Sequence, residues 1–229
     1  MKVYDCFLFN GENLVLEIRL SQLSKFVDYF IIVEFSETHS GLKKKSLINK
    51  AILNKYKNKI RYFYIDEKLS TLNSWKRESY QRNQISRGIL DAKDDDLIII
   101  SDLDEIPNLE KINLNEIGDY VYAFSQLHSM YKINLYRNIK WIGSKICKKK
   151  ILPEPQWLRA LKVHKKYEYY RIDKMFDKTY YPKFKIIDDG GWHLGWLMKT
   201  HEIIDKLSAY AHTEHNNKKY KNFDYIKNC

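Results

Sequence analysis

Long apolar runs are missing from this sequence. The longest uninterrupted apolar stretches are four or five residues long, whereas a membrane-spanning helix needs about 20. No secretory signal precedes the first strand-like segment, because Met1 leads almost directly into residues 3–9. With 44% hydrophobic residues among 229, the chain can still bury a sizeable core. We therefore expect a folded protein of the cytoplasm rather than a membrane-spanning or secreted one.

Cysteine is scarce, and the glycine pattern of dinucleotide-binding loops is absent. The three cysteines, Cys6, Cys147 and Cys229, lie far apart, and neither a disulfide framework nor a metal-binding cluster has this spacing. Such usage indicates a reducing compartment. No Gly-x-Gly-x-x-Gly is present, so the sequence does not support a dinucleotide-binding Rossmann site.

Acidic residues are fewer than basic residues. The formal net charge is +11, with 40 lysines and arginines against 29 aspartates and glutamates, and such an excess attracts nucleic acids, phosphorylated ligands or anionic membranes. Lysine greatly outnumbers arginine, whereas base-reading and bidentate phosphate contacts favour arginine. We expect no nucleic-acid partner, and we keep peripheral contact with an anionic membrane as a hypothesis.

Apolar segments of strand length alternate with helical patterns in the first half of the chain. The strand-like segments are residues 3–9, 29–35, 60–65 and 97–100. Between them, Leu16, Leu20 and Leu23 recur at helical spacing, and residues 75–92 also have helical character. Strands this apolar, separated by helices, predict an α/β fold with a mostly parallel sheet covered on both faces.

The pattern changes after residue 107. Residues 120–136 are aromatic and β-branched, which predicts longer antiparallel strands, and residues 183–187 add another strand. A helix is predicted at about residues 200–212. Because no repeat or linker divides the chain, we predict a single domain over residues 1–229, with a parallel half at 1–107 and a mixed half at 108–229.

The strand at 97–100 ends in an acidic motif. Asp102 and Asp104 are two residues apart, so they share one face of an extended chain while the residue between them turns toward the core. Ligands bind beyond the carboxyl ends of such strands, and two carboxylates suit Mg²⁺ or Mn²⁺. The alternative is a helix-capping turn, with Asp104 or Asn108 as the cap and Pro107 near the first turn.

A polar helical segment precedes this strand. Residues 75–83 carry many long polar side chains, among them Arg77, Glu78, Gln81 and Arg82. Glu78 and Arg82 are four apart and could form an ordinary surface pair on a helix. Alternatively, Arg77, Gln81 and Asn83 could face a diphosphate, and the sequence does not choose between these alternatives.

A glycine-rich segment near the carboxyl end combines acids, an imidazole and indoles. It contains Asp188 and Asp189, then Gly190-Gly191, and then Trp192, His193 and Trp196. Paired glycines permit close approaches that bring such side chains together. Tryptophan faces suit sugar rings, so Trp192 and Trp196 are candidate substrate contacts. His193 is either a ligand for a borderline metal such as Mn²⁺ or a packed structural histidine.

Taken together, these motifs resemble glycosyltransferase family 17. The resemblance covers residues 4–215 and rests on Tyr4-Asp5-Cys6-Phe7-Leu8-Phe9-Asn10, Glu17-Ile18-Arg19-Leu20, Val33-Glu34, Thr38-His39-Ser40-Gly41, Ser101-Asp102-Leu103-Asp104-Glu105-Ile106-Pro107 and Gly190-Gly191-Trp192-His193. It implies a GT-A-type fold, a nucleotide-sugar donor such as UDP-N-acetylglucosamine, a glycan acceptor, a divalent metal (Mn²⁺ or Mg²⁺) and inversion at the anomeric carbon.

The resemblance also implies roles for particular residues. Residues 1–107 become the nucleotide-sugar-binding half and residues 108–229 the acceptor-side half. The donor is expected to contact Asn10, Glu34, Arg77, Gln81, Arg82 and Asp102. Asp104 is expected to coordinate the metal, with Asp102 near the ribose or reaching the metal through water, and with His193 as a further ligand. Asp189 or Asp188 is expected to be the general base, with Glu105 as the reserve.

Three other classes of protein remain open at this stage. A nucleotidyltransferase would share the paired carboxylates and the parallel sheet, but it typically begins with a glycine-rich phosphate loop, which is absent. A metal-dependent nuclease would suit the positive charge, and it would release nucleotides from a polymer. A non-catalytic carbohydrate-binding protein could use the tryptophans but would not need Asp102 and Asp104. Animal relatives act in the Golgi lumen, whereas we expect a cytoplasmic enzyme that builds a bacterial or viral surface glycan.

Overall fold

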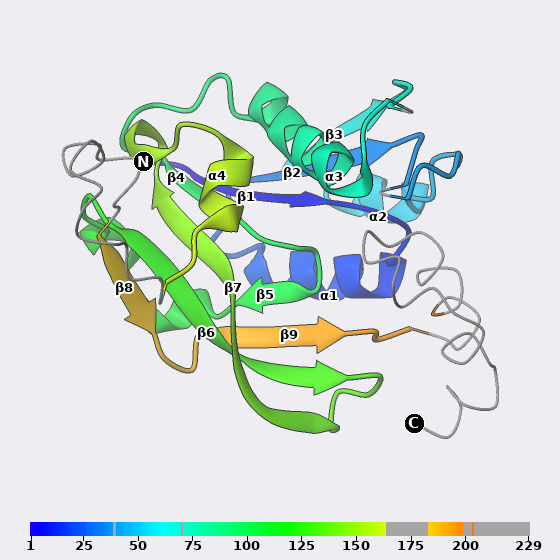
Figure 1. Ribbon diagram of the computed structural model, residues 1–229. Coiled ribbons are helices and arrows are strands. Elements are labelled where there is room, and N and C mark those ends of the chain that lie inside the picture. Colours follow the sequence, from blue (N-terminus) through cyan, green and yellow to red (C-terminus); the bar gives the residue numbers. More distant parts are fainter. Residues whose placement is uncertain (39, 70, 164–182, 199–202, 204–229) are drawn as a thin grey trace, which may run out of the picture.

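A computed structural model describes residues 1–38, 40–69, 71–163, 183–198 and 203 of the chain. In chain order, its elements are β1 (Val3–Leu8), α1 (Asn13–Leu23), β2 (Tyr29–Phe35), α2 (Lys50–Lys55), β3 (Ile60–Ile65), α3 (Ser74–Asn83), η1 (Gln84–Gly88), β4 (Leu97–Ile100), β5 (Glu105–Pro107), η2 (Leu109–Lys111), η3 (Leu114–Glu116), β6 (Val121–Met130), β7 (Tyr136–Lys148), η4 (Lys149–Ile151), α4 (Pro155–Ala160), β8 (Phe184–Ile187) and β9 (Gly191–Gly195). The strands form one nine-stranded sheet in the order β3-β2-β1-β4-β7-β6-β9-β5, with β8 paired to β6 (Figure 1).

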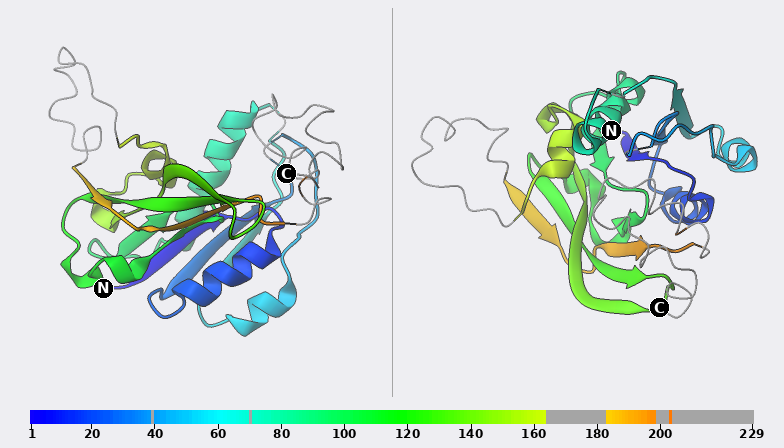
Figure 2. Two further views of the ribbon diagram at one scale, coloured as in Figure 1. Left: turned by 90° about the horizontal axis from the view of Figure 1, so that it is seen from below. Right: turned by 45° about the vertical axis from the view of Figure 1, so that its right-hand side comes forward.

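The amino-terminal half is parallel, as the apolar segments predict. Strands β1 to β4 pair parallel to one another, and the predicted segments 29–35, 60–65 and 97–100 match β2, β3 and β4. Helices α1 and α2 cover one face of this half and α3 covers the other (Figure 2). Alternate strand residues therefore enter two separate cores: Phe7, Ile32 and Ile99 pack in the first, and Cys6 and Ile31 in the second.

The carboxyl-terminal half is mixed, which confirms the predicted change of character. Strands β6 and β7 form a long antiparallel pair, and β7 also pairs antiparallel with β4 and so joins the two halves. Strands β8 and β9 run parallel to β6, and β5 pairs antiparallel with β9. The fold is thus one α/β domain with a nine-stranded, mostly parallel sheet flanked by helices.

Some local expectations were wrong. The predicted helix at 75–92 is α3 up to Asn83, and the 3₁₀ helix η1 then takes over. Pro107 lies in β5 rather than in the first turn of a helix, while Asn108 does cap the short η2, its side chain accepting from the Glu110 amide. The predicted helix at 200–212 lies outside the described residues apart from residue 203. In the described part of the chain, no helix is both long and apolar enough to span a membrane.

Candidate active site

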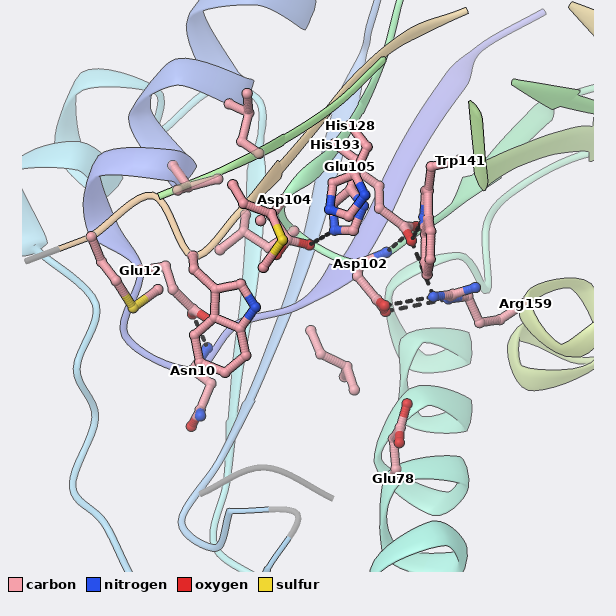
Figure 3. A pocket seen from close by; sticks show the side chains of 18 of the residues that line it. Asn10, Glu12, Glu78, Asp102, Asp104, Glu105, His128, Trp141, Arg159 and His193 are labelled. Carbon is pink, nitrogen blue, oxygen red and sulfur yellow. Dashed lines mark hydrogen bonds and ion pairs between the residues drawn. The ribbon is translucent and has the colours of Figure 1, made fainter. Parts of the chain in front are cut away.

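A cavity lies where the parallel strands end. Its volume is about 570 Å³, which is within the range of small-ligand sites. Asn10 follows the end of β1, and Asp102 and Asp104 follow the end of β4, while the other walls come from α3, β6, β7, α4 and β9. Figure 3 shows carboxylates, imidazoles and the Trp141 indole converging there. Because open sheets bind ligands beyond the carboxyl ends of their strands, we take this cavity as the candidate active site.

A buried arginine fixes the loop that carries the two aspartates. Arg19 of α1 is fully buried and donates to both carboxylate oxygens of Asp5 in β1, at 2.8 and 2.6 Å. The same guanidinium donates to Ser101 Oγ at 2.6 Å and to three backbone carbonyls of residues 102, 103 and 105 at 2.8 to 3.1 Å. The acidic loop is thus tied to β1 and α1 by one buried side chain rather than by regular secondary structure.

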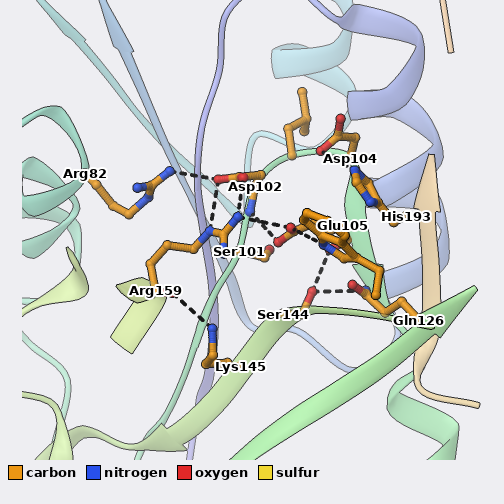
Figure 4. A network of polar contacts seen from close by, with 12 residues as sticks. Arg82, Ser101, Asp102, Asp104, Glu105, Gln126, Ser144, Lys145, Arg159 and His193 are labelled. Atoms are coloured by element: carbon orange, nitrogen blue, oxygen red, sulfur yellow. Dashed lines mark hydrogen bonds and ion pairs between the residues drawn. The ribbon is translucent and has the colours of Figure 1, made fainter. Parts of the chain in front are cut away.

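Asp102 lies between two arginines. Its carboxylate accepts from Arg82 Nη2 of α3 at 2.8 Å and from Arg159 Nη2 of α4 at 2.6 Å (Figure 4). Burial opposes the charge on Arg159, but Asp102 and Glu105 outweigh that effect and hold its pKa well above the ordinary value. The structure therefore brings together Asp102 and Arg82, each of which was predicted to contact the donor, and adds a second guanidinium that the sequence did not indicate.

Glu105 is buried beneath the same arginine. Its carboxylate accepts from Trp141 Nε1 at 2.7 Å, from Arg159 Nη2 at 3.1 Å and from the Asp102 amide at 3.1 Å. Gly143 of β7 makes room for it, because a Cβ there would lie 2.3 Å from the Glu105 carboxyl carbon. With its side chain 1% exposed and three donors bound, Glu105 supports the site and is poorly placed to take a proton from an acceptor.

Asp104 and His193 are neighbours in the lining of the cavity. His193 Nε2 lies 3.8 Å from Asp104 Oδ1, and its ring stacks on His128 at a centroid distance of 4.4 Å. Burial, His193 and Arg137 lower the pKa of His128, so that imidazole is neutral near pH 7. The predicted neighbourhood of Asp104 and His193 is therefore present in the structure.

Asp104 and His193 are the candidate ligands for the predicted metal. Within the described ranges, no group of three or more histidine, cysteine, aspartate or glutamate side chains could hold an ion by itself. Asp104 and His193 supply one oxygen and one nitrogen donor, and Mg²⁺ or Mn²⁺ commonly completes its shell with water and substrate phosphates. Asp102, with its two arginines, is less available. The residues fit an ion that arrives together with a phosphorylated ligand.

The other predicted donor contacts divide into two groups. Asn10 lines the cavity, as does Trp196, which was predicted as a substrate contact. Glu34 is instead buried in β2, where it accepts from Lys44 at 2.6 Å and from Tyr62 at 2.6 Å. The remaining contacts are structural links between α3 and the loops before it: Arg77 Nη2 donates to the Leu72 carbonyl at 2.8 Å, and Gln81 Nε2 donates to the Glu37 carbonyl at 2.9 Å.

Asp188 and Asp189 lie outside the cavity. Their side chains are 75% and 87% exposed, and they face Lys140 and Lys111 at 3.5 and 3.9 Å. They belong to the turn before β9, whereas the cavity lies at the other end of that strand, around His193 and residues 194–196. Trp192, 37% exposed, is not among the lining residues either. A catalytic role for either aspartate stays a prediction that this geometry does not favour.

The paired glycines permit a close approach, as the sequence indicates, but the segments that approach one another are β9 and β5. Gly191 has φ +121°, and a Cβ there would lie 2.1 Å from the Ile106 carbonyl oxygen. Strand β9 can therefore approach β5 closely enough to pair Glu105 with His193. The glycines thus bring the imidazole to the acidic loop, while the aspartates before them remain at the surface.

Sequence reasoning missed Trp141, Arg159 and His128. Trp141 and His128 come from β7 and β6, whose register across the sheet is a long-range property. Arg159 lies in α4, a helix of six residues, and the Pro155 at its first position is the signal that could have located this helix. Nothing in the local sequence pairs Arg159 with an aspartate 57 residues earlier.

Comparison with known proteins identifies the class of this protein as a glycosyltransferase. The sequence model of glycosyltransferase family 17 matches residues 1–229. The chain belongs to glycosyltransferase family 17, which confirms the resemblance found in its motifs. As a glycosyltransferase it works with a sugar donor and an acceptor.

Two solved structures are similar to this chain at low sequence identity. One is the inositol-1-phosphate CTP transferase from T. maritima, 12% identical with a TM-score of 0.43, covering 98% of this chain and 96% of that chain. The other is a glycosyltransferase involved in the glycosylation of the major capsid of PBCV-1, 10% identical with a TM-score of 0.35, covering 82% of each chain. With TM-scores this low, neither likeness bears on the reaction. No curated protein matches the sequence.

Proposed function

We propose that this glycosyltransferase has a GT-A-type fold and transfers N-acetylglucosamine from UDP-N-acetylglucosamine to a glycan hydroxyl, with inversion at the anomeric carbon. The observation that carries the proposal is the fixed acidic loop. It follows a central parallel strand, presents Asp102 and Asp104 to a cavity of about 570 Å³, and lies against two arginines. This is an arrangement that can hold a diphosphate and the sugar attached to it.

In this proposal, the donor diphosphate binds between the acidic loop and α3. Arg82 and Arg159 are held in position by Asp102, so their guanidinium groups need little reorganisation as charge develops on the departing phosphate. Preorganised donors of this kind are among the largest contributions to catalysis. Asn10, at the end of β1, is then within the same cavity and is the proposed contact to the nucleotide.

A divalent ion is part of this proposal. Mn²⁺ or Mg²⁺ held by Asp104 and His193 would neutralise negative charge on the leaving diphosphate as a Lewis acid. The protein residues do the remaining work: Arg19 keeps the loop in place, and His128 stacks on His193 and restricts the orientation of its ring.

The net charge supports a proposal about location. A charge of +11 would draw a cytoplasmic enzyme to an anionic membrane that holds a lipid-linked acceptor. Co-sedimentation with anionic and neutral vesicles tests this proposal. Binding should require anionic lipid and weaken with salt, because the Debye length falls from ~10 Å at 0.1 M to ~3 Å at 1 M. Binding that ignores both lipid charge and salt would contradict it.

A donor panel tests the reaction. Purified protein is incubated with UDP-, GDP- and CMP-sugars, with Mn²⁺, Mg²⁺ or chelator, and with and without candidate glycans, and nucleotide release is measured. We expect release from UDP-N-acetylglucosamine that depends on the ion and rises with an acceptor. The control variant is Glu110→Gln, which removes an exposed carboxylate that pairs with Lys25 and does not line the cavity; it should release nucleotide as wild type does. Release from another donor alone would refute the donor assignment, and equal release in chelator would refute the metal.

A further inference from the structure

A second cavity adjoins the candidate active site. Its volume is about 770 Å³, and it shares one wall with the first cavity, formed by Trp75, Glu78, Arg82, Trp141 and Arg159. Its other side is built by β7 and α4. Because the same residues line both cavities, a ligand in the second cavity would lie next to a donor in the first, which is the relation that two substrates of one transfer reaction require.

The lining of the second cavity has the chemistry of a sugar site. Two indoles from different elements, Trp75 of α3 and Trp141 of β7, present amphipathic faces, and Trp75 is 55% exposed. The hydrogen bond from Trp141 Nε1 to Glu105 fixes the plane of its ring. Gln156 adds an amide held by Arg82 at 2.8 Å. Apolar walls with a few fixed polar groups are typical of small-ligand sites.

Glu78 is the carboxylate that reaches both cavities. Among the described residues that line them, the other carboxylates, Glu12, Asp102, Asp104 and Glu105, line the first cavity alone. The side chain of Glu78 is 21% exposed and accepts from Arg82 at 2.9 Å through Oε1. In Figure 3 it points from α3 toward the space below Asp102 and Arg159. Both carboxylate oxygens of Asp102 and of Glu105 accept hydrogen bonds, whereas the bond from Arg82 to Glu78 uses Oε1.

We propose that the second cavity binds the acceptor sugar and that Glu78 is the general base; this proposal rests on the proposed function. The acceptor hydroxyl gives its proton to the Glu78 carboxylate, and its oxygen forms the new bond to the anomeric carbon of the donor. The bond from that carbon to the phosphate oxygen breaks, and its electron pair leaves with the nucleoside diphosphate. Arg82 holds Glu78 on one side and faces the leaving diphosphate on the other.

Glu78→Gln tests the base, because the amide keeps the shape and the carbonyl that accepts from Arg82 but cannot take a proton. The probes are UDP-N-acetylglucosamine with water, and the same donor with azide, an anionic nucleophile that needs no base. We expect UDP affinity within about twofold of wild type. Hydrolysis should fall by ~10²–10⁴-fold, the usual contribution of a general base. Azide-dependent UDP release should stay within a few-fold of wild type.

The control is Glu67→Gln, which removes an exposed carboxylate paired with Arg87 and bonded to Tyr80 of α3, and which should change neither reaction. A parallel loss of hydrolysis and azide reaction in Glu78→Gln would mean a structural role and overturn the proposal. Hydrolysis within a few-fold of wild type would overturn it as well. Wild-type protein that releases nucleotide from no sugar donor, with water or azide, would instead refute the proposed function itself.

Trp75→Ala tests the cavity. With methyl glycosides of mannose, galactose and N-acetylglucosamine as acceptor probes, we expect this variant to raise the KM of the accepted glycoside at least tenfold and to raise the donor KM by less, because Trp75 lines both cavities. Trp192→Ala, on β9 outside both cavities, is the matched control and should leave both constants unchanged. Equal acceptor KM values for Trp75→Ala and wild type would overturn the assignment. So would a wild-type enzyme that hydrolyses its donor but uses none of the three glycosides.

Discussion

Removing Arg19 should destabilise the protein more than breaking any exposed ion pair would. Arg19→Met leaves the Asp5 carboxylate, 0% exposed, without its guanidinium, and deprives Ser101 and three loop carbonyls of a donor. Breaking a buried pair by removing one partner costs about 3–5 kcal/mol, a large part of the ~5–15 kcal/mol that stabilises a typical domain. Urea unfolding with an m-value of about 3 kcal/mol/M should show a midpoint lower by roughly 1 to 1.7 M.

Two variants check that reasoning. Lys25→Ala breaks a pair in which both side chains are 62% exposed, and it should cost no more than ~1 kcal/mol. Asp5→Asn combined with Arg19→Met should be more stable than Arg19→Met alone, because the unpaired buried charge is gone. The interpretation of Arg19 as the residue that fixes the loop is refuted if Arg19→Met lowers the free energy of unfolding by less than about 1 kcal/mol. It is also refuted if the double variant is less stable than both Arg19→Met and Lys25→Ala.

Three further changes follow from the site. Asp104→Ala should abolish the enhancement of UDP binding by Mn²⁺ measured by calorimetry while the fold is kept, and an enhancement as large as in wild type would remove Asp104 from the metal site. Gly143→Ala should cost ~1–3 kcal/mol through overpacking against Glu105, whereas Gly118→Ala, whose nearest contact would be an ordinary 3.4 Å, should cost far less; equal losses would contradict the close packing. Burial, followed by Arg159, lowers the pKa of Lys145 to about 8, so in the folded state Lys145 loses its proton before the unfolded chain does. Wild type should therefore gain stability relative to Lys145→Met as pH rises from about 8 to 10, by on the order of 3 kcal/mol at most, and a stability difference independent of pH would refute the shift.

The parallel half could be predicted because its signals are local. Three of the four early strands match their predicted ranges, since runs such as 97–100 are apolar on both faces and the sheet is covered on both faces. Element ends were less predictable: α3 gives way to η1 after Asn83, although residues 84–89 keep helical spacing. Ile85 in η1 and Ile89 just after it are both buried, so apolar residues four apart do not require a continuous α-helix.

The site residues, too, could be predicted only where their signals are local in the sequence. Asp102, Asp104 and Arg82 were found because a strand end and a helix pattern locate them within a short stretch of chain. Asp188 and Asp189 were predicted to be in the site because they precede the glycines in the sequence. An extended strand advances ~3.3 Å per residue, so the four positions between Asp189 and His193 are enough to put the aspartates outside the cavity. Arg159 and Trp141 reach Glu105 and Asp102 through the register of β7 and the placement of α4, which depend on packing of the whole sheet. The guanidinium groups that decide whether the acidic loop binds a metal or an arginine thus come from segments 20 and 57 residues away, and no motif within the loop encodes them.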